Sequence, residues 1–133
     1  MYGLDKEWFF THPEIEKMKI RDKLTLMEES GALIIQAHPF REASYIDYIR
    51  LFPRNVHGVE IINASRSDEE NDMAKHYAEQ YSLFKFAGSD NHTASNRKKL
   101  AGVCCAEPVC DVADFIAKVK NQKVDVFTIT NED

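Results

Sequence analysis

The chain has 133 residues, 44% of them apolar and 29% charged, which is the composition of one ordinary globular domain. Its formal net charge of -5 argues against a general nucleic-acid-binding protein, because such a protein carries a basic stripe. No apolar run approaches the roughly 20 residues that a membrane-spanning helix needs, and the first residues lack the pattern of a signal peptide. We therefore expect a cytoplasmic protein with no membrane partner.

The first half of the chain predicts alternating helices and strands. Thr11 and Glu14 form a potential capping box with Pro13 in the first turn, so a helix is expected from Thr11 to Gly31. The apolar run 32–37 then predicts a strand, and tyrosines and isoleucines predict a short helix over 44–51. After a loop, the segment 58–63 predicts a second strand.

The second half continues the same pattern. Ser67 and Glu70 form another capping box, which opens a helix with an apolar stripe of Met73, Tyr77 and Tyr81. Further strands are expected over 84–87, 102–106 and 124–129, with a helix capped by Asp111 whose apolar face is Val112, Phe115, Ile116 and Val119. Strands separated by helices, without an internal repeat, indicate a single α/β domain with a mostly parallel sheet.

Three cysteines, Cys104, Cys105 and Cys110, are an odd number and include two neighbours in sequence. This pattern is not typical of a disulfide framework, and it lacks the Cys-x-x-Cys spacing of a zinc ribbon. We interpret the cysteines as small strand or core residues. A reactive or metal-binding thiol is the alternative.

Two segments carry residues suited to chemistry: Ala37-His38-Pro39-Phe40 and Gly88-Ser89-Asp90-Asn91-His92. Each follows a predicted strand, and ligands of α/β proteins gather at the carboxyl ends of the strands. His38, Asp90 and His92 are therefore expected on one rim, where a carboxylate and two imidazoles are suitable ligands for a metal ion. The structural alternatives are a turn histidine before a proline, and an Asx-turn followed by an exposed histidine.

The order Ala-His-Pro and then Gly-Ser-Asp-x-His resembles the last two metal-binding motifs of the PHP (polymerase and histidinol phosphatase) family. The segment 58–63 between them is also similar to the family, and the likeness runs from Tyr2 to Val126. This resemblance implies a distorted (β/α)7 barrel that binds zinc, manganese or iron and hydrolyses phosphate esters. It also implies that His38, Asp90 and His92 are metal ligands.

The family's early motifs, a His-x-His strand and then another histidine and a glutamate, have no counterpart in this chain. We interpret the remaining histidines, His12, His57 and His76, as structural or surface residues. The chain therefore resembles the carboxyl-terminal half of a PHP barrel, a partial (β/α) barrel. We expect little or no phosphatase activity from it alone, because a polynuclear site needs more ligands than this chain supplies.

Arg41, three residues after His38, is the candidate contact for a substrate phosphate, because a guanidinium binds phosphate in a bidentate manner. A solvated loop arginine is the alternative. Weaker candidates of the same kind are Arg66 and the cluster Arg97-Lys98-Lys99. Glu60 and Asn63, at the end of their predicted strand, are candidates for side chains that contact the metal ligands without binding the ion.

The partner implied by the resemblance is a phosphorylated small molecule or nucleotide. A second hypothesis is a non-catalytic assembly module. Soluble proteins rarely leave sheet edges unpaired, so a half-barrel is expected to pair with a second copy or with a separate amino-terminal half.

Overall fold

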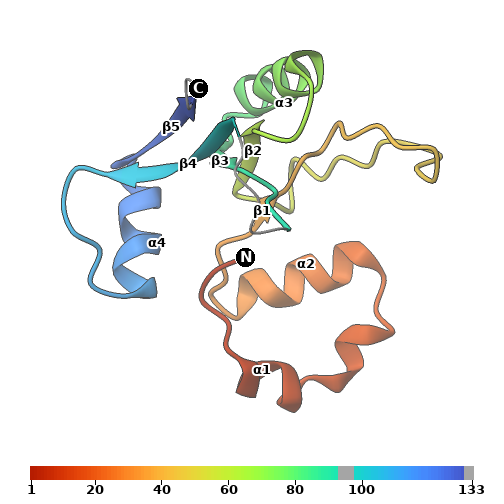
Figure 1. The fold of residues 1–133 in the computed structure, drawn as a ribbon. Helices are drawn as coiled ribbons and strands as arrows, with labels where there is room; N and C mark the ends of the chain where they lie inside the picture. The colour runs from red at the N-terminus through yellow and green to blue at the C-terminus, as the bar shows by residue number, and fades with distance from the viewer. Residues whose placement is uncertain (93–97, 131–133) are drawn as a thin grey trace.

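The computed structural model describes residues 1–92 and 98–130. At its centre is a three-stranded parallel sheet in the order β1-β2-β3, formed by Ile35–Gln36, Gly58–Asn63 and Phe84–Gly88. The last two strands, β4 (Lys99–Cys105) and β5 (Val124–Thr130), form a separate antiparallel ribbon (Figure 1). The prediction of a mixed α/β fold with a mostly parallel sheet is thus confirmed for the central strands, whereas the final pair is antiparallel.

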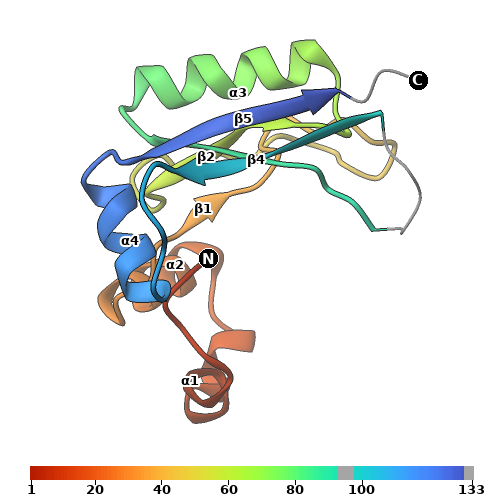
Figure 2. The ribbon, with the colours of Figure 1, turned by 60° about the vertical axis from the view of Figure 1, so that its left-hand side comes forward.

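Two helices cover opposite sides of the strands (Figure 2). On one side, α3 (Asp68–Gln80) buries Ala74, Tyr77 and Ala78 against Val59 and Ile61 of β2. On the other side, α4 (Val112–Lys120) contributes Val119, which packs with Leu33 and Phe86. Burial of both faces explains why the central strands are dense in apolar residues.

The helix expected from Thr11 to Gly31 is wrong in its first part. The chain instead forms α1 (Lys6–Thr11), the 3-10 helix η1 (Pro13–Glu16) and α2 (Ile20–Glu29). Asp5 caps α1 by accepting a hydrogen bond of 2.9 Å from the Trp8 N–H. Thr11 ends this helix, and its hydroxyl donates to the Trp8 carbonyl at 3.0 Å. Pro13 has no N–H to continue α1, which accounts for the break.

Two further expectations need correction. The segment 44–51 is irregular and not helical, and Tyr45 and Tyr48 are exposed. The four residues of its expected apolar face, Tyr45, Ile46, Tyr48 and Ile49, are all exposed. A short helix without packing is not stable in water. The strand expected over 32–37 is reduced to Ile35–Gln36, while Leu33 forms an antiparallel bridge with Tyr2.

The other capping predictions are confirmed. The Ser67 hydroxyl accepts from the Glu70 N–H at 3.2 Å, and the Glu70 carboxylate accepts from the Ser67 N–H at 2.8 Å. Asp111 caps α4 through the Asp114 N–H at 2.8 Å. The apolar stripe expected on α3 is only partly correct, since Tyr77 is buried but Met73 and Tyr81 are exposed.

The three cysteines are free. Cys104 and Cys105 lie in β4, as the strand interpretation expected, whereas Cys110 lies in the connection before α4. Cys104 and Cys110 are exposed, so neither is a core residue. Within the described part of the chain, no helix is both long enough and apolar enough to cross a membrane.

Candidate functional site

The candidate ligands follow the ends of neighbouring parallel strands. β1 leads into His38, β2 ends at Asn63, and β3 ends at Gly88, two residues before Asp90. Because β1, β2 and β3 are parallel, their carboxyl ends lie at one edge of the sheet. The backbone therefore brings both motifs to the same rim.

Asp90 and His92 face each other in the turn after β3. The Oδ1 atom of Asp90 lies 2.9 Å from Nε2 of His92. The Asp90 side chain is 17% exposed and that of His92 is 84% exposed, so the pair lies at the surface of the rim. Asp90 has a φ of 47°, in the left-handed region that aspartate tolerates better than most residues. A carboxylate oxygen and an imidazole nitrogen directed at each other fit a pair of ligands for one divalent ion.

His38 is held differently. Its φ is 29°, also positive, and its backbone N–H donates to Oε2 of Glu60 at 2.8 Å. Among residues 1–92 and 98–130, no three His, Cys, Asp or Glu side chains are grouped closely enough to hold a metal ion. The described structure thus brings two candidate ligands, Asp90 and His92, together in one turn, and it places His38 on the same rim without joining its imidazole to them.

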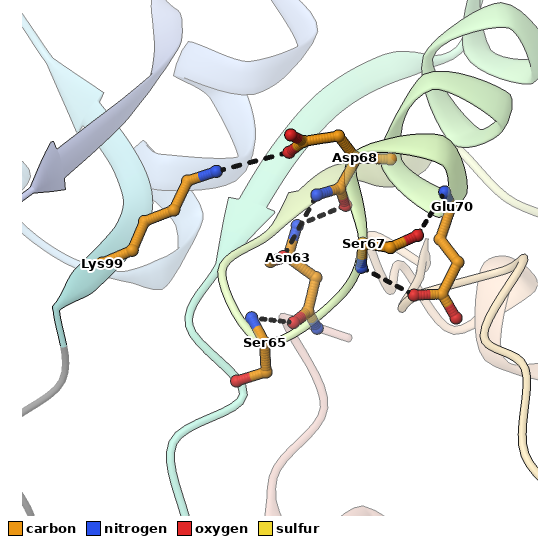
Figure 3. A network of polar contacts seen from close by, with 7 residues as sticks. Asn63, Ser65, Ser67, Asp68, Glu70 and Lys99 are labelled. Carbon is orange, nitrogen blue, oxygen red and sulfur yellow. Dashed lines mark hydrogen bonds and ion pairs between the residues drawn. The ribbon is translucent and has the colours of Figure 1, made fainter.

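Asn63 anchors a polar network behind the rim (Figure 3). Its side chain is buried, with 1% of the residue exposed. The Nδ2 group donates to Glu60 Oε2 at 3.1 Å, and Oδ1 accepts from the Ser65 N–H at 2.9 Å. The Asn63 backbone exchanges two hydrogen bonds with the side chain of Asn71 on α3, at 2.9 and 3.2 Å. These contacts fix the end of β2 to the start of α3.

The network continues from β2 to the later strands through serines. The Ser65 hydroxyl donates to the Ser89 carbonyl at 2.7 Å, immediately before Asp90. The Ser89 hydroxyl in turn donates to the Ala101 carbonyl and accepts from the Ala101 N–H, both at 2.9 Å. Sequence reasoning missed Asn71, Ser65 and Ser89, because their partners lie far away along the chain. For Ser65 and Ser89 the only signal was the position of a small polar residue after a predicted strand, and Asn71 lies within α3 with no such signal.

A pocket of about 380 Å³ lies beside His38 and is also lined by Arg41, Tyr45, Tyr48 and Arg50. The Arg41 guanidinium lies 5.7 Å from the centre of the Tyr45 ring, and that of Arg50 lies 4.6 Å from the centre of the Tyr48 ring. Arg41 is therefore on the wall of a pocket that contains a candidate ligand. This position suits a contact to a bound phosphate.

Two of the other basic candidates, Lys99 and Arg66, lie near the start of α3. Lys99, at the start of β4, forms an ion pair of 3.7 Å with Asp68 of α3 (Figure 3). Arg66 follows Ser65 in the turn between β2 and α3, and Arg97 lies outside the described residues. Arg41 and Arg66 thus lie on the β1 and β2 side of the described rim.

The charges of Arg41 and Arg66 lower the pKa of Glu70, the carboxylate of the capping box at the start of α3. Burial by itself raises the pKa of Glu70, but the N–H groups of Glu42 and Ser67 and the charges of Arg66 and Arg41 together hold the pKa below its usual 4.5. The lower folded-state pKa means that ionised Glu70 stabilises the fold above the unfolded-state pKa. This stabilisation is lost as the pH falls through the folded-state value.

We expect the free energy of unfolding of the wild-type chain to decrease more between about pH 6 and pH 3 than that of Glu70→Gln. Glutamine keeps the shape of the side chain but has no charge to lose, so the two profiles should converge at low pH. Urea denaturation at a series of pH values measures both profiles. Parallel profiles over this range would contradict the role assigned to Glu70.

The other histidines have structural or surface positions, in agreement with the interpretation from the sequence. The His12 ring stacks on Trp8 with centroids 4.3 Å apart, and its Nδ1 lies 2.8 Å from the Trp8 carbonyl oxygen. His57 Nδ1 accepts from the Ile34 N–H at 3.0 Å. His76 is exposed on α3.

No family model, curated protein or solved structure matches this chain.

Proposed function

We propose that this chain is part of a PHP-family metal-dependent phosphoesterase, in which a metal-activated water hydrolyses a phosphate ester. The likeness of the motifs at 37–40 and 88–92 suggests the family. The observation that carries the proposal is the position of both motifs after parallel strands of one sheet, with Asp90 and His92 facing each other at 2.9 Å. A partial (β/α) barrel, the carboxyl-terminal half of the family's barrel, is the matching fold.

Asp90 and His92 are the residues that would hold a zinc, manganese or iron ion, with His38 joining them from the end of β1. Such an ion supplies Lewis acidity and lowers the pKa of a bound water toward neutrality. The carboxylate of Asp90 contributes negative charge to the site, and the imidazoles contribute neutral donors. Arg41, on the wall of the pocket beside His38, would orient the phosphoryl group of a phosphorylated small molecule or nucleotide.

These residues supply fewer ligands than two or three ions require, so the chain by itself is expected to have little or no phosphatase activity. Metal binding is therefore the property to test first. We expect Zn²⁺ or Mn²⁺ to raise the midpoint of thermal unfolding, because a ligand that binds only the folded state stabilises it. The shift should be reduced in His38→Ala and retained in His76→Ala, a matched variant of the exposed helix histidine. Equal shifts in both variants would argue against His38 as a ligand.

A second candidate function is a non-catalytic assembly module, and one observation favours it. Side chains at Asp125, Phe127 and Ile129 share one face of the antiparallel ribbon, because side chains alternate along a strand. Phe127 is 37% exposed and Ile129 is 49% exposed, and exposed Cys104 lies opposite Asp125. Among the described strands, β5 is hydrogen-bonded to β4 alone, so its other edge has no strand partner within residues 1–92 and 98–130.

A second copy fits this edge. If two β5 strands pair antiparallel about a twofold axis at Phe127, Asp125 lies opposite Ile129 of the partner and not opposite another carboxylate. We expect such a dimer to dissociate in Phe127→Asp, which places two carboxylates together at the axis. Light scattering after size-exclusion chromatography measures the mass of both proteins. A wild-type monomer, or a dimer that survives this substitution, would contradict pairing through β5; a complex formed only with a separate amino-terminal half would identify the other partner.

A further inference from the structure

A single carboxylate, that of Glu60, contacts both turns that carry the candidate ligands. Its Oε2 atom accepts from the His38 N–H at 2.8 Å and from Asn63 Nδ2 at 3.1 Å. Its Oε1 atom lies over Gly88, where an added Cβ would be only 2.4 Å away. Glu60 therefore links the segment after β1 to the end of β3 across β2.

The local structure of β2 directs Glu60 to this place. Its neighbours Val59 and Ile61 are buried in the cluster beneath α3, so Glu60 points to the opposite face of the sheet. The pairing of β2 with β3 shifts between Glu60, which lies opposite Phe86, and Ile62, which lies opposite Ala87. Such bulges redirect side chains and are frequent beside functional sites.

Two of the candidate ligands, His38 and Asp90, have an unusual backbone conformation. His38 and Asp90 have φ values of 29° and 47°, a region that residues other than glycine rarely occupy. Such conformations persist where the surrounding structure holds them. For His38 the holding contact is direct, since its own N–H is bonded to Glu60. On the side of Asp90, the same carboxylate lies close to Gly88, two residues earlier.

We infer that Glu60 is the positioning residue of the metal site: it fixes the backbone of both ligand-bearing turns without itself holding the ion. This inference rests on the proposed function, and it adds a residue that acts through His38 and Asp90. Gly88 is needed for the same arrangement, because only a residue without a side chain leaves room for the Glu60 carboxylate.

A double-mutant cycle tests the inference. We expect Glu60→Ala to weaken Zn²⁺ binding about 10- to 100-fold, the usual effect of losing a residue that orients ligands. Gly88→Ala should have a similar effect, because its Cβ displaces the carboxylate. The double variant should bind no more weakly than Glu60→Ala alone, because the side chain that clashes is then absent. Glu60→Gln should stay within about threefold of the wild type, because its amide oxygen still accepts from the His38 N–H.

Two matched variants control for general destabilisation. Glu29→Ala removes an exposed glutamate at the end of α2, and Gly102→Ala adds a methyl group in β4, 3.0 Å from the ring of the half-exposed Phe127. Both should leave Zn²⁺ affinity unchanged in isothermal titration calorimetry. Hydrogen exchange of the His38 amide gives a readout that needs no metal: protection in the wild type should be lost in Glu60→Ala and kept in Glu60→Gln.

The outcomes separate the inference from the proposed function. Wild-type Zn²⁺ binding that is unchanged in Glu60→Ala and Gly88→Ala would overturn the positioning role and leave the metal site standing. Additive losses in the double variant would also overturn it, since they would mean that the two residues act independently. A wild-type chain that binds no Zn²⁺ would overturn the proposed function, and the role of Glu60 in a metal site with it.

Discussion

Replacing Asp90 with alanine is expected to weaken the binding of Zn²⁺ or Mn²⁺ by about a hundredfold or more, beyond the usual cost of losing a residue that only orients ligands. Asp90 is the one carboxylate among the three candidate ligands, so its removal takes away the negative charge that balances the cation. Its side chain is 17% exposed and its Oδ1 atom faces His92 Nε2 at 2.9 Å. A partly shielded charge at this separation contributes more to cation binding than a fully solvated one.

Isothermal titration calorimetry with each ion measures this effect. Asp72→Ala is the matched control, because Asp72 is an exposed aspartate on α3 and carries the same charge. We expect the control to keep wild-type affinity within about twofold, since exposed charges at a distance are screened by salt. If Asp90→Ala and Asp72→Ala weaken binding equally, the ion is attracted by the net negative charge of the chain and not by a site in the turn after β3.

Replacing Leu33 with alanine is expected to cost about 3–4 kcal/mol of folding stability. Leu33 has no exposed surface and packs with Phe86 of β3 and Val119 of α4. Its backbone also exchanges two hydrogen bonds of 2.9 Å with Tyr2, so the site cannot collapse easily around a smaller side chain. A loss of this size is a large part of the total stability of a typical domain, so the variant should be partly unfolded at 37 °C.

Urea denaturation of Leu33→Ala beside Ile129→Ala checks this expectation. Ile129 is 49% exposed on the ribbon, so its truncation should cost less than about 1 kcal/mol. The comparison separates burial in the layer between the sheet and α4 from the general effect of removing an aliphatic side chain. Similar losses for the two variants would mean that Leu33 does not lie in a close-packed core.

The elements that were predicted correctly are those with local signals. Ser67 and Glu70 contact each other three residues apart, so their sequence pattern contains the whole capping box. The segment 58–63 has the apolar density of a strand covered on both sides, and it forms β2 over the same residues. Asp111 precedes the apolar face of α4 in the same way.

The elements that were missed depend on the tertiary context. The segment 44–51 has helical spacing, but the residues of its expected apolar face are exposed and the segment is irregular. Asp5, and not Thr11, caps the first helix. The hydroxyl of Thr11 instead donates to the carbonyls of Glu7 and Trp8 inside α1. The antiparallel direction of the last two strands depends on how the chain returns after α4, which the residue pattern does not encode.

The same distinction applies to the candidate site. The positions of His38 and Asp90 after strands followed from the alternation of elements along the chain. The contacts of Glu60 with His38 and of Ser89 with Ala101 join residues that are far apart in sequence, so no local pattern predicts them. Sequence reasoning therefore located the candidate ligands and named Glu60 and Asn63 behind them, but it did not predict the contacts that these two residues make.

Native mass spectrometry of the purified chain, with and without added Zn²⁺ or Mn²⁺, tests the proposed metal site most directly, because one spectrum gives both the number of bound ions and the oligomeric state. We expect one specifically bound ion per wild-type chain and none in Asp90→Ala. A wild-type chain whose mass stays metal-free at every ion concentration, whether as monomer or dimer, would contradict the metal site and leave assembly as the function to pursue.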